Sequence, residues 1–233
     1  MWATLVAILG TTISPYLFFW QTSEEVEEEK NHGRRRVTQR LGATPEEILN
    51  RKVDVVTGTL FSNLVFYFII LTTGLTLHDS GQTQIETSRQ AAEALRPLAG
   101  EFAAMLFAAG LIGTGLLAVP TLAGSAAYAF ADTFGWRQGL DERFGRAQAF
   151  YAVFIASITI GIAVDFAGIS AIKALFITAI VNGLLAPFLL LGILIVGCDR
   201  SLMQEQPSSM LSRIVVGFTT ALMFCAAIGM FVF

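Results

Sequence analysis

The sequence of 233 residues is 54% hydrophobic and 14% charged, and its mean hydropathy is +0.64. This composition excludes an ordinary water-soluble domain and predicts an all-α, polytopic helical membrane protein in contact with the lipid bilayer, because several apolar runs approach the roughly 20 residues that span a membrane. The formal net charge is −3 and the charges gather in the loops, so no basic surface points to a nucleic-acid partner.

Apolar runs in the chain predict six transmembrane segments, the first of them broken. We expect these segments to form a single transmembrane domain over residues 1–233. The predicted segments lie at about residues 2–21, 53–75, 98–131, 147–166, 172–196 and 213–233.

The first segment contains residues that interrupt a helix. Pro15 has no backbone N–H and clashes with the carbonyl four residues earlier, while Gly10 and the Thr11-Thr12 pair are poor helix formers. The helix should therefore break between Gly10 and Ser14. Broken membrane helices are where transporters place ion sites, because unwound carbonyls coordinate the cation there. An ordinary proline kink is the alternative interpretation of this stretch taken alone.

The polar stretch after the first segment carries an acidic run from Glu24 to Glu29 and a helix-start pattern at Thr44-Pro45-Glu46-Glu47. We favour a solvated helix over a metal-binding loop for the acidic run. Thr44 is placed to cap a helix in which Pro45 occupies the first turn. In the third segment, Gly110 to Gly124 and many alanines predict close helix packing at the centre of the bundle.

The basic residues predict which side each loop faces. Six segments alternate sides, and twelve of the fifteen Lys and Arg residues lie in or beside the loops 22–52, 132–146 and 199–212. By the positive-inside rule these loops are cytoplasmic. The first segment then descends from outside to inside, and the C-terminus lies outside.

The run Gly10-Thr11-Thr12-Ile13-Ser14-Pro15-Tyr16 resembles the sixth transmembrane helix of the bacterial branch of the natural resistance-associated macrophage protein (Nramp) family of divalent-metal transporters. The similarity extends over nearly the whole chain. It implies a LeuT-like fold of two inverted repeats, of which this chain would hold the second repeat plus one extra helix, helices six to eleven. The other resembling stretches are 23–29, 128–132, 134–141, 172–176 and 182–187.

The resemblance also implies a metal site. Ser14 matches the position at which manganese and iron transporters of the family have a methionine ligand, and Thr11 matches the residue that offers its backbone carbonyl. Tyr16 stands where those transporters have a histidine. Gly10, Tyr16 and Asn182 are candidates for the transport path, although an interhelical hydrogen bond is the favoured role for Asn182.

These departures from the family pattern change the expected chemistry. A serine hydroxyl with carbonyl oxygens is a harder ligand set than a thioether, and it suits Mg²⁺, Ca²⁺ or Mn²⁺. Without the histidine, a group with a pKa near neutrality that could relay protons is missing. The aspartate that the family's first helix supplies is not in this chain, so we expect tight metal binding to require another polypeptide.

We therefore predict secondary transport of a divalent metal cation of the Mn, Fe or Mg class across the inner (cytoplasmic) membrane by alternating access, together with an N-terminal five-helix half. The alternative is a non-transporting interaction or regulatory fragment that packs with a full-length transporter. Half of a sodium-coupled amino-acid transporter is disfavoured because the helix-six signature differs. No catalytic residue, enzymatic constellation or cofactor motif is recognised in the sequence.

Overall fold

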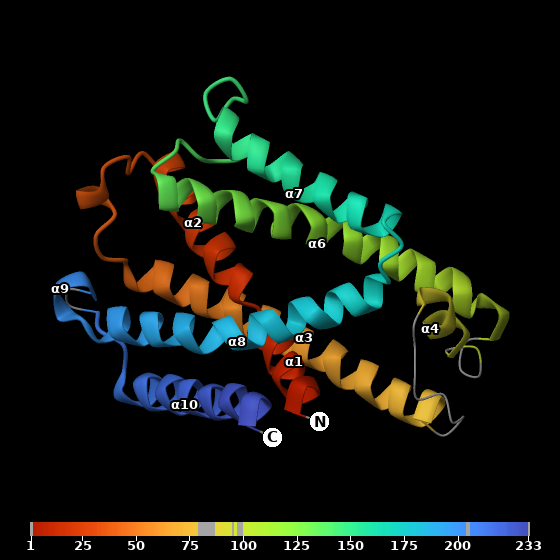
Figure 1. Ribbon diagram of the computed structural model, residues 1–233. Helices are drawn as coiled ribbons and strands as arrows, with labels where there is room; N and C mark the ends of the chain where they lie inside the picture. Colours follow the sequence, from red (N-terminus) through yellow and green to blue (C-terminus); the bar gives the residue numbers. More distant parts are fainter. Residues whose placement is uncertain (1, 79–86, 95, 97–99, 204–205, 233) are drawn as a thin grey trace. The chain divides into compact units, whose positions relative to one another are not determined.

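The structure of the chain is a computed structural model that describes residues 2–78, 87–94, 96, 100–203 and 206–232. Over these residues the regular structure is helical throughout, which confirms the predicted all-α, polytopic fold (Figure 1). Six helical stretches within the described residues are long and apolar enough to cross a membrane. They are Trp2–Asn31, Pro45–Thr76, Gly100–Phe134, Gln148–Phe166, Ala171–Cys198 and Met210–Val232.

The individual helices follow this segmentation closely. The first stretch consists of two helices, and short helices lie between the longer ones. The described α-helices are α1 (Trp2–Ile13), α2 (Pro15–Asn31), α3 (Pro45–Thr73), α4 (Ser88–Ala94), α6 (Ala103–Phe134), α7 (Gln148–Phe166), α8 (Ala171–Cys198), α9 (Arg200–Met203) and α10 (Met210–Val232).

The predicted break in the first segment is present. Ser14 separates α1 from α2 and is the only non-glycine residue with a positive φ among the described residues, at φ 38° and ψ 73°. Pro15 opens α2, where its missing N–H costs nothing and its fixed φ suits the first turn.

Two predicted boundaries move by several residues. Helix α2 continues through the acidic run to Asn31, so this run belongs to the same helix as the apolar residues before it. Helix α3 begins at Pro45 rather than near residue 53. There the predicted cap is formed, because Thr44 Oγ1 accepts the Glu47 N–H at 3.2 Å and the Glu47 carboxylate accepts the Thr44 N–H at 2.7 Å. The predicted start of the third segment, at residues 98–99, lies outside the described residues. The predicted end of the sixth segment, at residue 233, also lies outside them.

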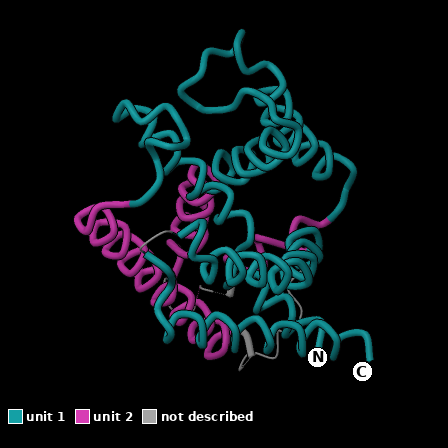
Figure 2. Tube along the Cα trace, turned by 90° about the vertical axis from the view of Figure 1, so that its left-hand side faces the viewer, with its two compact units in different colours: residues 1–42, 118–169, 173–233 teal, residues 43–117, 170–172 magenta. Residues whose placement is uncertain are grey.

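The chain divides into two compact units (Figure 2). One comprises residues 1–42, 118–169 and 173–233, and the other comprises residues 43–117 and 170–172. The first unit therefore holds α1, α2, the C-terminal part of α6, α7, most of α8, α9 and α10. The single transmembrane domain expected for the whole chain stays a prediction.

Two hydrophobic clusters form the core of the first unit. In the first cluster, buried residues of α6 pack with Phe150 of α7 and with Ala147, which caps α7, and Trp20 of α2 packs against them. In the second, buried residues of α8 and α10 pack with Leu9 and Ile13 of α1. The buried members are Ala127, Tyr128, Ala131, Ala147 and Phe150 in the first cluster, and Ala186, Leu190 and Met223 in the second.

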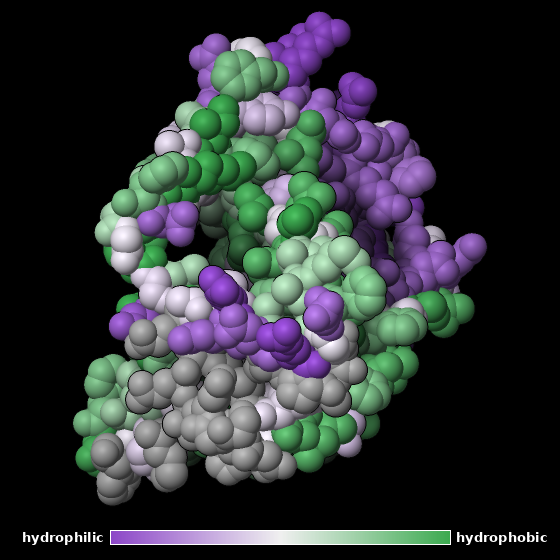
Figure 3. Space-filling view, turned by 90° about the vertical axis from the view of Figure 1, so that its right-hand side faces the viewer, coloured by the Kyte–Doolittle hydropathy of each residue, from purple (hydrophilic) through white to green (hydrophobic). Residues whose placement is uncertain are grey.

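The small residues of the third predicted segment pack closely only in part. A Cβ at Gly124 would collide with the ring of Trp20, whereas a Cβ at Gly110, Gly113 or Gly115 would meet nothing within 4 Å. Among the described glycines of α6, close packing is therefore found only at Gly124, in the C-terminal part of the helix. Large apolar side chains cover much of the exposed surface, including Phe166 at 87% and Phe231 at 75% exposure, and Figure 3 shows apolar patches of this kind on one face.

Candidate functional site

The junction between α1 and α2 arises because Pro15 lacks the backbone N–H that would continue the helix. In a continuous helix the carbonyl of Thr11 would accept the N–H of residue 15, but Pro15 has none. The hydroxyl of Ser14 takes its place and donates to the Thr11 carbonyl at 2.7 Å. The Ser14 N–H still bonds to the Gly10 carbonyl at 3.2 Å, and the Leu17 N–H bonds to the Ser14 carbonyl at 3.0 Å. The two halves are therefore separated by one residue, with little unwound backbone.

The threonine hydroxyls before the break turn back into α1. Thr11 Oγ1 donates to the Ile8 carbonyl at 2.9 Å, and Thr12 Oγ1 donates to the carbonyls of Ile8 at 3.0 Å and Leu9 at 2.9 Å. These bonds satisfy the hydroxyl protons locally, within α1. The C-terminal end of α1 also carries the partial negative charge of its helix dipole.

The pair of oxygens at Thr11 and Ser14 has a spacing suited to a cation. Adjacent ligands of an octahedral Mg²⁺ ion, each about 2.1 Å from the metal, lie about 3 Å apart, and Ca²⁺ tolerates a wider range of geometries. The Ser14 Oγ to Thr11 carbonyl distance of 2.7 Å is close to this separation. A cation could bind both oxygens once the serine proton turns away. Both oxygens are neutral, so the charge needed to dehydrate a divalent ion must come from another group.

Carboxylates do not gather at this junction in the part of the chain that the structure describes. Over those residues no group of three or more His, Cys, Asp or Glu side chains is arranged to hold a metal ion. The candidate ligands here are thus a hydroxyl and a carbonyl, outside any such group in the described residues.

Gly10 lies at a close crossing of α1 and α8. A Cβ at Gly10 would fall 2.7 Å from the Cα of Gly183, and a Cβ at Gly183 would fall 2.7 Å from Cγ1 of Val6. Asn182 is the neighbour of Gly183 and is half-buried, so it lies on α8 beside this crossing. The main chains of α1 and α8 thus approach closely at Gly10 and Gly183, and Asn182 lies next to this contact.

The remaining predicted path residues are partly accessible. Tyr16 and Ser14 are half-buried, and Thr11 is exposed. No hydrogen bond of the Asn182 or Tyr16 side chain is found among the described residues. The interhelical hydrogen bond considered for Asn182 is therefore not formed within the described chain.

The N-terminal half-helix α1 is anchored to α8 and α10. Besides the glycine crossing with α8, the ring of Trp2 lies over Gly229 of α10, where a Cβ would come within 2.8 Å of it. Leu9 and Ile13 pack into the cluster that α8 and α10 form. These contacts use the small residues of two helices to hold α1 closely.

The C-terminal half-helix α2 is held chiefly by α6 and the segment that follows it. Trp20 packs edge-on against Tyr128 at a centroid distance of 6.1 Å. The Tyr128 hydroxyl donates to the Glu27 carboxylate at 2.6 Å and accepts the Leu140 N–H at 3.3 Å. Phe18 is an exception, since it packs on the cluster of α8 and α10. The sequence analysis missed the contact of Tyr128 with Glu27, because 101 positions separate them and neither residue carries a local signal of the pairing.

Comparison with known proteins gives two findings. The family model described as Natural resistance-associated macrophage protein-like matches residues 1–233. The chain is also 24% identical over 200 residues to the divalent metal cation transporter MntH of Aeromonas hydrophila subsp. hydrophila, an alignment that covers 85% of this chain and 44% of the relative. The chain thus spans about half the length of this relative.

Proposed function

Because the chain belongs to the natural resistance-associated macrophage protein-like family, we propose that it takes part in the secondary transport of a divalent metal cation across the cytoplasmic membrane. Its relative from Aeromonas hydrophila is named as a divalent metal cation transporter, which supports this class of substrate. The proposal rests above all on one observation: the Ser14 hydroxyl and the Thr11 carbonyl lie 2.7 Å apart at a break in a membrane helix.

The proposed cation site uses these two oxygens as part of its ligand set. Both are hard ligands, and a site built from them with a carboxylate from the N-terminal half would favour Mg²⁺, Mn²⁺ or Ca²⁺ over softer transition metals. Gly10, Tyr16 and Asn182 line the proposed path on either side of the break. The close crossing of α1 and α8 at Gly10 and Gly183 supports a position for Asn182 beside this path.

The anchoring of the two half-helices supports alternating access. Helix α1 packs on α8 and α10, whereas the acidic end of α2 is bonded to α6 and the segment 136–146. A change at Ser14 could therefore move one half with one set of helices and leave the other half in place. Such a motion would open the site to one side of the membrane at a time.

In the proposed topology the loops 22–52, 132–146 and 199–212 face the cytoplasm and the C-terminus lies outside. The distribution of basic residues supports this orientation. We further propose that the chain corresponds to helices six to eleven of a LeuT-like transporter and works with an N-terminal five-helix half that supplies the missing carboxylate.

A second candidate function is a non-transporting fragment that packs with a full-length transporter. It is favoured by the neutral character of the Thr11 and Ser14 oxygens, because a site without a carboxylate would bind a divalent ion weakly. The two functions predict different behaviour in reconstituted membranes.

Uptake into proteoliposomes tests the proposal. The chain is reconstituted alone and together with an N-terminal five-helix half, and uptake of Mg²⁺, Mn²⁺ and Ca²⁺ is measured in parallel. Transport predicts uptake by the combined sample that falls at least about tenfold in Ser14→Ala, because a lost ligand costs more than about 1.4 kcal/mol. Unchanged uptake in Ser14→Ala, or equal uptake by empty liposomes, would count against it.

A further inference from the structure

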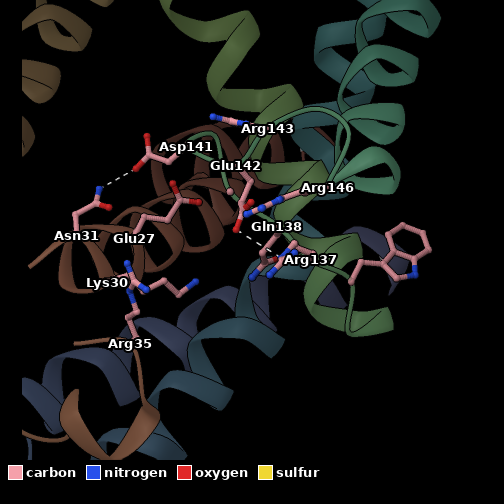
Figure 4. A pocket seen from close by; sticks show the side chains of 12 residues that line it. Glu27, Lys30, Asn31, Arg35, Arg137, Gln138, Asp141, Glu142, Arg143 and Arg146 are labelled. Atoms are coloured by element: carbon pink, nitrogen blue, oxygen red, sulfur yellow. Dashed lines mark hydrogen bonds and ion pairs between the residues drawn. The ribbon is translucent and has the colours of Figure 1, made fainter. Parts of the chain in front are cut away.

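A cavity of about 720 Å³ lies between the C-terminal end of α2 and the segment 136–146 that connects α6 to α7 (Figure 4). It belongs entirely to the first compact unit. Its lining is rich in charge, with five basic side chains and three acidic ones. The basic residues are Lys30, Arg35, Arg137, Arg143 and Arg146, and the acidic residues are Glu27, Asp141 and Glu142.

The three carboxylates of this cavity are already engaged by other side chains. Hydrogen bonds or an ion pair hold each of them at short range, and the five basic side chains still exceed the three carboxylates by two charges. The pairs are Glu27 with the Tyr128 hydroxyl at 2.6 Å, Asp141 with the Asn31 amide at 2.8 Å, and Glu142 with the Arg137 guanidinium at 3.5 Å.

The other four basic side chains make no ion pair with a carboxylate within the described residues. Two of them come from the end of α2 and the turn after it, and two come from the segment before α7, so they approach the cavity from both of its walls (Figure 4). Like charges that converge on one hollow repel one another, and an anion between them removes that repulsion. These residues are Lys30, Arg35, Arg143 and Arg146.

The chemistry of the basic side chains points to phosphate. A guanidinium group presents its N–H donors as a planar fork that matches two phosphate oxygens, and lysine adds a point charge. The volume exceeds what one phosphate ion needs, so there is room for the group to which the phosphate is esterified. Trp136 also lines the cavity, and tryptophan prefers the level of lipid headgroups.

We propose that this cavity binds the phosphate group of an anionic ligand. In the proposed topology it faces the cytoplasm at the membrane surface, where basic pockets between helices bind the headgroups of anionic lipids. An inner-leaflet phospholipid such as phosphatidylglycerol is therefore the favoured source, and free phosphate is the other. The site is separate from the cation path at Ser14, and occupation would bridge the end of α2 to the segment 136–146.

Lipid binding to the purified chain in detergent tests this site by native mass spectrometry. Phosphatidylglycerol, phosphatidylcholine and inorganic phosphate are added to the wild type and to the double variant Arg143→Gln with Arg146→Gln. We expect phosphatidylglycerol to bind more tightly than phosphatidylcholine. In the double variant, the apparent Kd for phosphatidylglycerol should rise at least about tenfold, because charged hydrogen bonds to phosphate are lost.

Two further variants test whether lipid binding depends on the cavity itself and not on total charge. Arg35→Gln tests the opposite wall and should also weaken phosphatidylglycerol binding. The paired change Lys52→Gln with Arg200→Gln removes the same charge at exposed positions outside the cavity lining and should leave binding unchanged. Size-exclusion chromatography and circular dichroism verify that each variant is folded.

The remaining outcomes decide the source of the phosphate and whether the site exists. If inorganic phosphate competes with phosphatidylglycerol and binds alone with similar affinity, the phosphate site stands and the lipid assignment is overturned. If the cavity variants bind phosphatidylglycerol as the wild type does, or the control pair loses as much affinity, the site itself is refuted.

Discussion

The hydroxyl of Ser14 donates a 2.7 Å hydrogen bond to the carbonyl oxygen of Thr11. This bond replaces the main-chain bond that Pro15 cannot make, and it joins the two residues that the family resemblance implies as metal ligands. The same feature breaks the helix and sets two oxygens at a spacing that a cation can share. A local backbone requirement and a candidate site therefore coincide at one residue.

Replacing Ser14 separates its two roles. Ser14 has a φ of 38°, a conformation that costs a non-glycine residue about 1 kcal/mol. Ser14→Gly should relieve this strain while removing the hydroxyl, whereas Ser14→Ala keeps the strain and also loses the bond to Thr11. We expect the glycine variant to unfold at a higher temperature than the alanine variant. Thermal unfolding in detergent, followed by tryptophan fluorescence, measures the difference, and an alanine variant that is the more stable would argue against the strain.

The crossing of α1 and α8 predicts a large effect of one methyl group. Gly183→Ala would place a Cβ 2.7 Å from Cγ1 of Val6, with the α1 backbone also in the way, so α1 must shift. We expect a loss of about 1–3 kcal/mol of stability, typical of overpacking. Gly192→Ala on the same helix is the control.

A Cβ at Gly192 meets nothing within 4 Å. The control should be neutral or slightly stabilising, because alanine favours a helix by up to about 1 kcal/mol over glycine. Equal unfolding temperatures for the two variants would mean that the close crossing is not formed.

The buried hydroxyl of Tyr128 should contribute measurably to stability. Tyr128→Phe removes the donor to Glu27 and leaves the Leu140 N–H without its acceptor. We expect a loss of about 1–3 kcal/mol, the cost of leaving a buried polar group unsatisfied. The matched change Tyr67→Phe, at a residue that is 59% exposed, should have little effect. Chemical unfolding of both variants provides the comparison, and a Tyr128→Phe curve that overlays the wild type would be inconsistent with this network.

Metal preference should follow the softness of the ligand at position 14. Ser14→Met introduces a thioether, which favours transition metals over hard cations. In proteoliposomes that hold the chain with its N-terminal half, uptake of Mn²⁺ relative to Mg²⁺ should rise by about tenfold or more. Ser14→Thr keeps a hydroxyl and serves as the control with an unchanged ratio. A Ser14→Met ratio equal to that of the wild type would place the ligand elsewhere.

The sequence predicts those features of the fold that depend on neighbouring residues. The break at Ser14 follows from Pro15, and the start of α3 follows from Thr44 and Glu47, because both depend on bonds within a few positions. The extension of α2 to Asn31 was missed, since the apolar run ends near Gln21 and hydropathy alone carries no signal of a helix that leaves the membrane.

The contacts between distant segments could not be predicted from local patterns. The small residues of α6 suggested a packed centre, yet of its described glycines only Gly124 has a neighbour within 4 Å of an added Cβ. The pairing of Glu27 with Tyr128 likewise depends on which helices meet. Of the candidate site, the sequence and the resemblance indicated Thr11 and Ser14, and the structure adds the bond that joins their oxygens.

The position of a bound metal ion tests the central claim most directly. Crystals of the chain assembled with its N-terminal half are soaked with Mn²⁺, and the ion is located by anomalous scattering. We predict a peak within about 2.6 Å of both Ser14 Oγ and the Thr11 carbonyl oxygen, the range for hard cations and oxygen ligands, and its loss in Ser14→Gly. A peak away from both oxygens, or one that persists unchanged in the variant, would contradict the proposed site.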